Sequence, residues 1–177
     1  MAELTVSGGT HPILKDDYAS DWMGIEVVAL ADGHATIRMA LRQEMLNGFG
    51  MAHGGMIFAF GDTAFALACN QTTPSPADEG NITVASGVDI NFLKPAFRGQ
   101  ILTAVANRRA STGRSGLYDV QIYAADPGTV TETPASAGSA PAATPPATTV
   151  PGELPTDSVP GELVAEFRGR SRTISKK

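Results

Sequence analysis

The chain has 177 residues, of which 42% are hydrophobic and 18% are charged, and it has a single cysteine. This length suits one domain with a hydrophobic core, so we expect residues 1–177 to form a single domain. The lone Cys69 excludes an internal disulfide and a cysteine-based zinc site, and the composition excludes collagen, a coiled coil and a wholly disordered chain.

The net charge of −5 comes from one segment. Residues 126–162 contain five acidic residues and no Lys or Arg, so the rest of the chain has 13 acidic and 13 basic residues. This balance argues against a broad basic face, and we expect no nucleic-acid partner. No apolar run reaches the roughly 18 residues of a membrane span, and charged residues interrupt the N-terminal region. We therefore expect a cytoplasmic protein that does not contact membranes.

The first half of the chain predicts short elements followed by one long helix. In chain order we expect a short helix at 13–19, strands at 23–30 and 35–41 around the turn 31–33, and a glycine-rich loop at 47–55. Residues 54–70 are apolar on every side, with Asp62 as their only charge. This pattern and its length indicate a buried helix.

Four strands are expected after this helix, at 84–93, 101–110, 117–124 and 163–174. The segment 126–162 holds eight of the twelve prolines and no aromatic residue, so we predict a disordered hairpin insertion. Only 15 residues follow it, and the strand they form must return to pair with an earlier one. The order predicts an α+β fold in which an antiparallel sheet wraps around one long central helix.

Candidate chemical groups gather on the helix at 54–70. Gly54 and Gly55 open it, where free backbone N–H groups and the helix dipole can bind an oxyanion, although a tight turn would also need glycine. Asp62 is a carboxylate in an apolar helix, which is costly unless the group is paired structurally or used in catalysis. His53 is either an anchor for the turn or a general base.

The spacing of two of these residues predicts a homodimer. Gly54 and Asp62 are eight residues apart, which separates them by about 12 Å along the helix axis. One helix therefore cannot aim both groups at one carbonyl. Two antiparallel copies would bring the N-terminus of one helix beside the middle of the other, so we expect the site to be completed at a homodimer interface.

The run Asn47-Gly-x-x-x-x-His53-Gly54-Gly55, with Asp62 seven residues further on, resembles the signature of the phenylacetyl-CoA thioesterase (PaaI-type) branch of the hotdog-fold acyl-CoA thioesterases. Segments 88–95, 116–122 and 167–170 are also similar, and the resemblance covers residues 12–125 and 163–174. It implies a hotdog fold, a homodimer that pairs into a homotetramer, and no cofactor or metal. It also implies hydrolysis of phenylacetyl-CoA or a hydroxylated aryl-acyl-CoA, in phenylacetic acid degradation.

The resemblance also implies a role for each motif residue. Asp62 matches the catalytic carboxylate, as base or nucleophile, and Gly54 matches the donor to the oxyanion. Asn47 matches the side chain that orients the thioester or water, and His53 matches a motif histidine with a more structural role. Some relatives have Ser or Thr near position 87, where this chain has glycine.

Further residues are candidates for binding the substrate. The hairpin at 111–116 offers backbone N–H groups for the phosphates of coenzyme A, although a solvated loop would have the same composition. Its candidate ligands are Arg114, Ser115 and Gly116, with Arg108 and Arg109 nearby. The acyl pocket is expected to include apolar and small residues that would serve equally well as ordinary core, namely Gly55, Phe58, Phe65, Leu67 and Phe92.

Two alternative functions remain open. One is a thioesterase for another aryl or medium-chain acyl-CoA, such as a dihydroxynaphthoyl-CoA. The other is a non-catalytic hotdog module that binds acyl-CoA, although the joint presence of Asp62, Gly54 and Asn47 disfavours it. A hotdog dehydratase is also disfavoured, because Leu67 stands where that class has a histidine.

Overall fold

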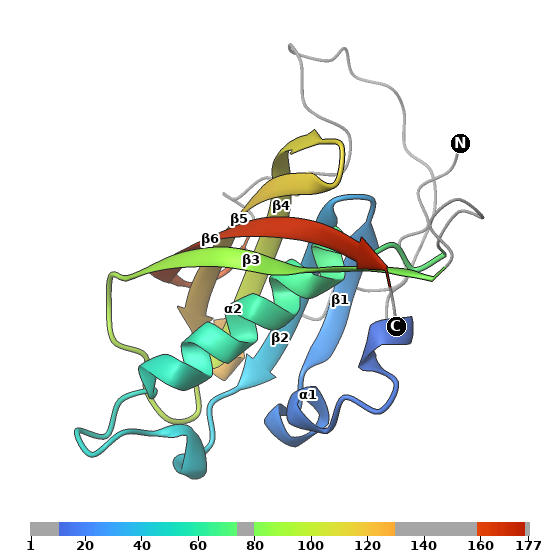
Figure 1. Cartoon of the computed structure of the whole chain (residues 1–177). Coiled ribbons are helices and arrows are strands. Elements are labelled where there is room, and N and C mark those ends of the chain that lie inside the picture. The colour runs from blue at the N-terminus through green and yellow to red at the C-terminus, as the bar shows by residue number, and fades with distance from the viewer. Residues whose placement is uncertain (1–10, 74–79, 130–158, 176–177) are drawn as a thin grey trace, which may run out of the picture.

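A computed structural model describes residues 11–73, 80–129 and 159–175 (Figure 1). They form one antiparallel sheet with the strand order β1-β2-β4-β5-β6-β3. The strands are β1 (Glu26–Ala31), β2 (His34–Ala40), β3 (Asn81–Phe92), β4 (Ile101–Thr112), β5 (Ser115–Ala125) and β6 (Glu162–Ser175). The sheet curves around the helix α2 (Gly54–Cys69), as the sequence predicted (Figure 1).

The N-terminal region differs from the prediction. In place of one helix at 13–19, the chain forms a 3-10 turn, η1 (Pro12–Leu14), and a separate short helix, α1 (Tyr18–Met23). The Asp17 carboxylate caps α1 by accepting a backbone N–H from its first turn. Gly24, in the left-handed conformation with φ 70°, ends the helix. The predicted strand at 23–30 therefore starts at Glu26.

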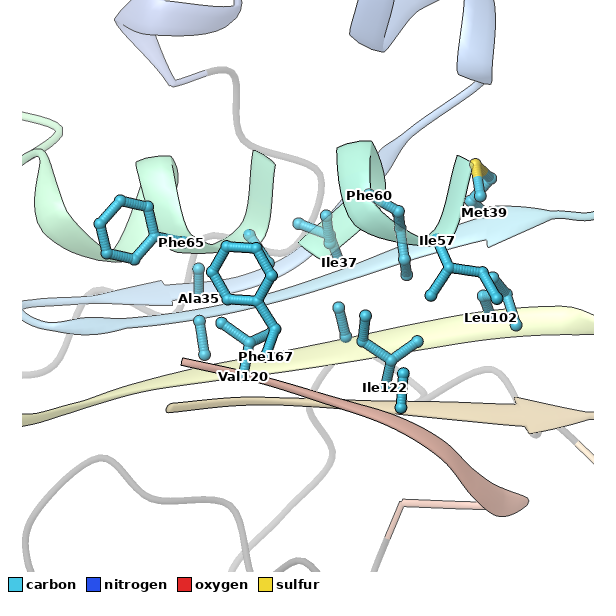
Figure 2. Close-up of a cluster of buried hydrophobic side chains, with 14 of the residues drawn as sticks. Ala35, Ile37, Met39, Ile57, Phe60, Phe65, Leu102, Val120, Ile122 and Phe167 are labelled. Carbon is cyan, nitrogen blue, oxygen red and sulfur yellow. The ribbon is translucent and has the colours of Figure 1, made fainter. Parts of the chain in front are cut away.

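The core lies between α2 and the concave face of the sheet (Figure 2). Ile57, Phe60 and Phe65 of α2 are at most 4% exposed. They face apolar side chains that alternate along the central strands, among them Ile37, Met39, Leu102, Val120, Ile122 and Phe167 (Figure 2). Burial of each large side chain contributes about 1.5–3 kcal/mol, so this layer fixes which face of α2 is turned away from the sheet.

The two edges of the sheet are unequal. β1 is a six-residue strand, whereas β3 has 12 residues and pairs only with β6. The side chain of Asn70 accepts the Thr83 N–H at 3.0 Å and donates to the Thr83 carbonyl oxygen at 2.9 Å. Beyond Thr83, the outer edge of β3 has no strand partner among the described residues. Such an open edge is a template for pairing with another chain.

The final strand returns to the sheet as predicted. β6 lies between β5 and β3, and its first residue, Glu162, pairs with Ala124 near the end of β5. The predicted insertion at 126–162 therefore connects two neighbouring antiparallel strands. The predicted bounds are too wide, because a 3-10 turn, η3 (Pro127–Thr129), follows β5 and Glu162 already belongs to β6. Residues 130–158 lie outside the described residues, so their disorder stays a prediction.

We expect the insertion to be dispensable for folding and activity. The ends of β5 and β6 are already paired, and the free-energy cost of closing a loop changes only with the logarithm of its length. Replacing residues 128–160 with a two-residue turn should leave the thermal unfolding midpoint and thiol release close to those of the full chain. A well-folded deletion variant with strongly reduced activity would contradict this prediction.

Candidate active site

The first turn of α2 leaves one backbone donor uncommitted. His53 caps the helix, and its Nδ1 accepts the N–H of Gly55 at 3.0 Å. The N–H groups of Met56 and Ile57 donate to the carbonyl oxygen of His53 at 2.9 and 3.2 Å. Among the described residues, the N–H of Gly54 has no hydrogen-bond partner. It is therefore the free donor at the positive end of the helix dipole.

This arrangement separates the roles of the three residues at the helix start. Because its Nδ1 accepts a hydrogen bond from the Gly55 N–H, the His53 side chain stabilises the turn. The same bond occupies the N–H of Gly55, which leaves Gly54 as the donor for an oxyanion. A Cβ atom at Gly54 would lie 3.3 Å from the ring of Phe92, so glycine keeps the approach to this N–H open.

Asn47 is fixed in the loop before α2. Its Oδ1 accepts the backbone N–H groups of Phe49 at 2.9 Å and of Met51 at 3.3 Å. These bonds orient the side-chain amide, and within the described ranges its Nδ2 has no partner. The Asn47 Nδ2 is therefore a preoriented donor in the loop that leads to Gly54.

Asp62 lies in the middle of α2 and is partly buried. Desolvation by burial raises the pKa of its carboxyl above the usual value. Its side chain makes no hydrogen bond or ion pair with the part of the chain that the structure describes. A raised pKa and an unpaired carboxylate are typical of a group that acts on a substrate.

Asp62 belongs to a stripe of α2 that borders the core and runs beside β3; the ring of Phe58 packs against Phe167 there, and Cys69 packs against the buried cluster. Phe58, Asp62 and Cys69, which we call the α2 stripe, share one helix face at helical spacing. At one end of α2 the ring of Phe92 lies against Gly54, and at the other end the thiol of Cys69 is 3.9 Å from the Thr83 carbonyl oxygen. The α2 stripe and the open edge of β3 therefore form one continuous surface.

A pocket of about 370 Å³ opens next to Gly54. It is lined by Met51, Ala52, Gly54, Ile57 and residues 92–96. A larger cavity of about 660 Å³ lies at the opposite end of α2. The predicted phosphate ligands Arg114, Ser115 and Gly116 line this second cavity, so one chain holds the two candidate regions at opposite ends of the helix.

The second cavity, which we call the cationic cavity, includes Lys15, Arg108 and Arg114 in its lining and no carboxylate side chain among the described residues. Arg108 forms a bidentate ion pair with Asp32, at 3.0 and 2.6 Å. Arg114 donates its Nε–H to the Thr173 carbonyl oxygen at 2.9 Å, which leaves its terminal nitrogens free of any described partner. Arg114 is therefore the arginine best placed to bind an anion there.

Comparison with known proteins identifies the family. Residues 49–131 match the sequence profile described as the Thioesterase superfamily. The chain is 38% identical over 112 residues to the acyl-coenzyme A thioesterase PaaI of Escherichia coli K12. The aligned stretch covers 63% of this chain and 75% of that protein. The chain belongs to the thioesterase superfamily. The family resemblance predicted from the sequence is confirmed, and the protein is a thioester hydrolase.

Solved structures agree with this thioesterase assignment. The E. coli PaaI structure superposes with a TM-score of 0.66 at 29% identity, covering 93% of this chain and 90% of that one. A variant of the phenylacetic acid degradation protein PaaI of Thermus thermophilus superposes with a TM-score of 0.60 at 23% identity, covering 88% and 98%. The thioesterase therefore has the predicted hotdog fold.

Two residues predicted for the acyl pocket lie elsewhere in this thioesterase. Phe65 is 1% exposed, and its ring packs against Tyr118 and Phe167 in the core. Leu67 is also 1% exposed. Neither side chain has an open surface from which to contact an acyl group, because the period of α2 turns both toward the interior. Phe58 differs, since it is 38% exposed on the α2 stripe.

One predicted cation also faces away from the cationic cavity. Arg109 donates to the Asp119 carboxylate, which also pairs with Arg168. Arg109 lies at a β-bulge between Arg108 and Ala110 and does not line the cationic cavity, whereas Arg108 does.

Sequence reasoning missed residues that contribute to both cavities. Met51 and Leu93 line the pocket beside Gly54, and His11, Lys15 and Tyr118 line the cationic cavity. Met51 and Leu93 lie within segments that the sequence analysis singled out, but only the fold brings each set of residues together around its cavity. No cluster of three or more potential metal ligands occurs within residues 11–73, 80–129 and 159–175. In the same residues, no helix is long and apolar enough to span a membrane.

Proposed function

We propose that this thioesterase hydrolyses an aryl acyl-CoA, phenylacetyl-CoA or a ring-hydroxylated relative, to the free acid and coenzyme A. The observation that carries the proposal is that one helix, α2, presents both a free N–H group, on Gly54, and a carboxylate that has no described partner, on Asp62. The name of the E. coli relative, an acyl-coenzyme A thioesterase, supports the acyl-CoA substrate class.

The two groups meet in a homodimer formed through the open edge of β3. α2 runs antiparallel to β3, because Gly54 lies by Phe92 and Cys69 lies near Thr83. Antiparallel pairing of β3 with a second copy would therefore set two α2 helices side by side in opposite directions. The Gly54 of one subunit then lies beside Asp62 of the partner subunit.

Symmetry places Phe58 on the two-fold axis of this dimer. If residue 54 faces residue 62 of the second helix, the axis passes midway between them, at residue 58. Phe58 is exposed on the α2 stripe and would meet its own copy there, which gives the dimer an aromatic contact. We therefore assign Phe58 to the dimer contact in place of the predicted substrate contact. As the family resemblance implies, two such dimers would form a tetramer.

In the proposed reaction, the Gly54 N–H donates to the thioester carbonyl oxygen and stabilises the negative charge that develops on it. Asp62 of the partner subunit acts in one of two ways. It removes a proton from water as the water attacks the carbonyl carbon, or it attacks that carbon itself and forms a mixed anhydride that water then hydrolyses. In both cases the C–S bond breaks, and the leaving thiolate takes up a proton. The Nδ2 of Asn47 would orient the thioester or water.

The cationic cavity is the proposed site for the phosphates of coenzyme A. Within one chain it lies a whole helix length, about 22 Å, from Gly54. In the antiparallel dimer, the cationic cavity of the partner subunit is closer. Cys69 of the partner subunit lines that cavity and lies only about 10 Å along α2 from Asp62 of the partner subunit. One substrate would then span from Gly54 of one subunit to Arg114 of the partner subunit.

Thiol release from a panel of acyl-CoA thioesters tests the proposed function. We expect kcat/KM for phenylacetyl-CoA or its hydroxylated analogue to exceed that for benzoyl-CoA, octanoyl-CoA and a dihydroxynaphthoyl-CoA. The preference should be broad, because one extra apolar contact contributes only about 1–3 kcal/mol to discrimination. A clear preference for octanoyl-CoA would overturn the aryl assignment alone. Binding of every thioester without thiol release would indicate a non-catalytic module.

A further inference from the structure

The pocket beside Gly54 differs in chemistry from the cationic cavity. The larger part of its lining is apolar, from Met51, Ile57, Phe92, Leu93 and neighbouring small residues. Lys94 is the one charged residue in its described lining, and its ammonium group pairs with the Glu162 carboxylate. A pocket of this kind favours a hydrocarbon group and disfavours a phosphate.

The walls of this pocket are held by the main chain of the fold. The N–H groups of Leu93 and Lys94 donate to the Val164 carbonyl oxygen of β6, at 2.8 and 3.2 Å. On the other side, the Ala52 N–H donates to the Ala96 carbonyl oxygen at 2.8 Å. The pocket is therefore preformed, and the side chains at its mouth are the parts that can vary in size and position.

Phe92 stands at that mouth, directly beside the proposed oxyanion donor. Its ring is the nearest group to the position of a Gly54 Cβ atom, at 3.3 Å, and the side chain is 53% exposed. A thioester whose carbonyl oxygen accepts the Gly54 N–H must place its next carbon atoms within reach of this ring. An aryl acyl group would pack against the ring as one aromatic on another.

We propose that this pocket binds the acyl group and that Phe92 determines which acyl groups it accepts. The inference rests on the proposed function, since it takes Gly54 as the oxyanion donor. It assigns the two ends of the substrate by chemistry: the hydrocarbon acyl group goes to the apolar pocket, and the anionic end goes to the cationic cavity. The ring of Phe92 favours a flat aryl group and narrows the entrance for a flexible alkyl chain.

Phe92→Ala tests this assignment through a ratio of two substrates. Removing the ring takes away the aromatic contact and widens the mouth of the pocket. The ratio of kcat/KM for phenylacetyl-CoA to that for octanoyl-CoA should fall about tenfold, a typical change for one apolar contact in a binding pocket. Leu93→Trp should instead make the pocket smaller. It should lower kcat/KM for both phenylacetyl-CoA and octanoyl-CoA relative to acetyl-CoA.

Phe97→Ala is the matched control, because Phe97 is 49% exposed, lies across a β-bridge from Met51 and does not line the pocket. Its substrate ratio should equal that of the unaltered protein. An unchanged substrate ratio in Phe92→Ala would overturn the inference but not the proposed function. The same holds if Phe92→Ala loses activity equally on both substrates and light scattering shows a smaller assembly. Phe92→Leu repeats the test with less change in volume. If the unaltered protein hydrolyses none of the thioesters, the proposed function falls and the inference falls with it.

Discussion

Replacing Asp62 with Asn should lower kcat for thioester hydrolysis at least about 100-fold, because the loss of a general base or nucleophile has at least this effect. The side chain keeps its size, and the carboxylate it replaces has no partner among the described residues, so the fold should remain intact. The measurement is thiol release at saturating substrate, with assembly size followed by light scattering. Turnover within a few-fold of the unaltered protein would show that Asp62 is not the catalytic carboxylate.

Asp119→Asn provides a control for the loss of a carboxylate. Asp119 pairs with Arg109 and Arg168 on the sheet face opposite α2, and these partners hold its pKa below the usual value. Its replacement should lower stability while leaving kcat almost unchanged. The two aspartates therefore separate a loss of chemistry from a loss of fold.

Whereas Asp119→Asn should lower the stability of the folded chain, Asp62→Asn should raise it at neutral pH. Burial raises the pKa of Asp62 in the folded chain, so the folded state favours the protonated carboxyl. The stabilisation from the protonated Asp62 carboxyl is fully present below the pKa of this group in the unfolded chain, near 3.8. It is lost as the pH rises through the pKa of the group in the folded chain. The amide of the variant is neutral at every pH. We therefore expect Asp62→Asn to raise Tm above that of the unaltered protein at pH 7, and this difference to shrink toward pH 4.

Mixing two inactive variants should restore activity if the site is shared between subunits. Asp62→Ala removes the carboxylate, and Gly54→Val places a side chain against the Phe92 ring, over the donor N–H. Random exchange at equal concentrations makes half of the dimers mixed, and each mixed dimer has one intact site of two. Thiol release should then reach about a quarter of the unaltered activity, from near zero in either variant alone.

The control for this experiment is a mixture of each variant with its own tagged copy, which exchanges subunits but contains no intact site. Subunit exchange is verified by recovering the untagged chain with the tagged one. Absence of activity in the mixed dimers, once exchange is shown, would mean that one chain builds the whole site. The proposed pairing of Gly54 with Asp62 of the partner subunit would then be wrong.

The sequence alone determined the fold class and named the residues that we propose for the chemistry. The long apolar run with a single charge fixed α2 and its one carboxylate, because such a run can be stable only when a sheet buries it. Strand alternation and the order of elements then led to an antiparallel sheet around that helix. The motif from Asn47 to Asp62 is contiguous in the chain, so its residues could be named from the sequence.

Only the tertiary structure decided which groups are free and which face inward. Hydrogen bonds from Gly55 to His53, and from the Asn47 loop to its own side chain, leave Gly54 N–H and Asn47 Nδ2 as the available donors. Burial of Phe65 and Leu67 removed them from the acyl pocket, because an apolar helix that is hydrophobic all round does not reveal its inner face. The pocket beside Gly54 joins residues from two loops, the end of β3 and the first turns of α2. Such contacts between distant segments are set by packing, which no local pattern in the sequence records.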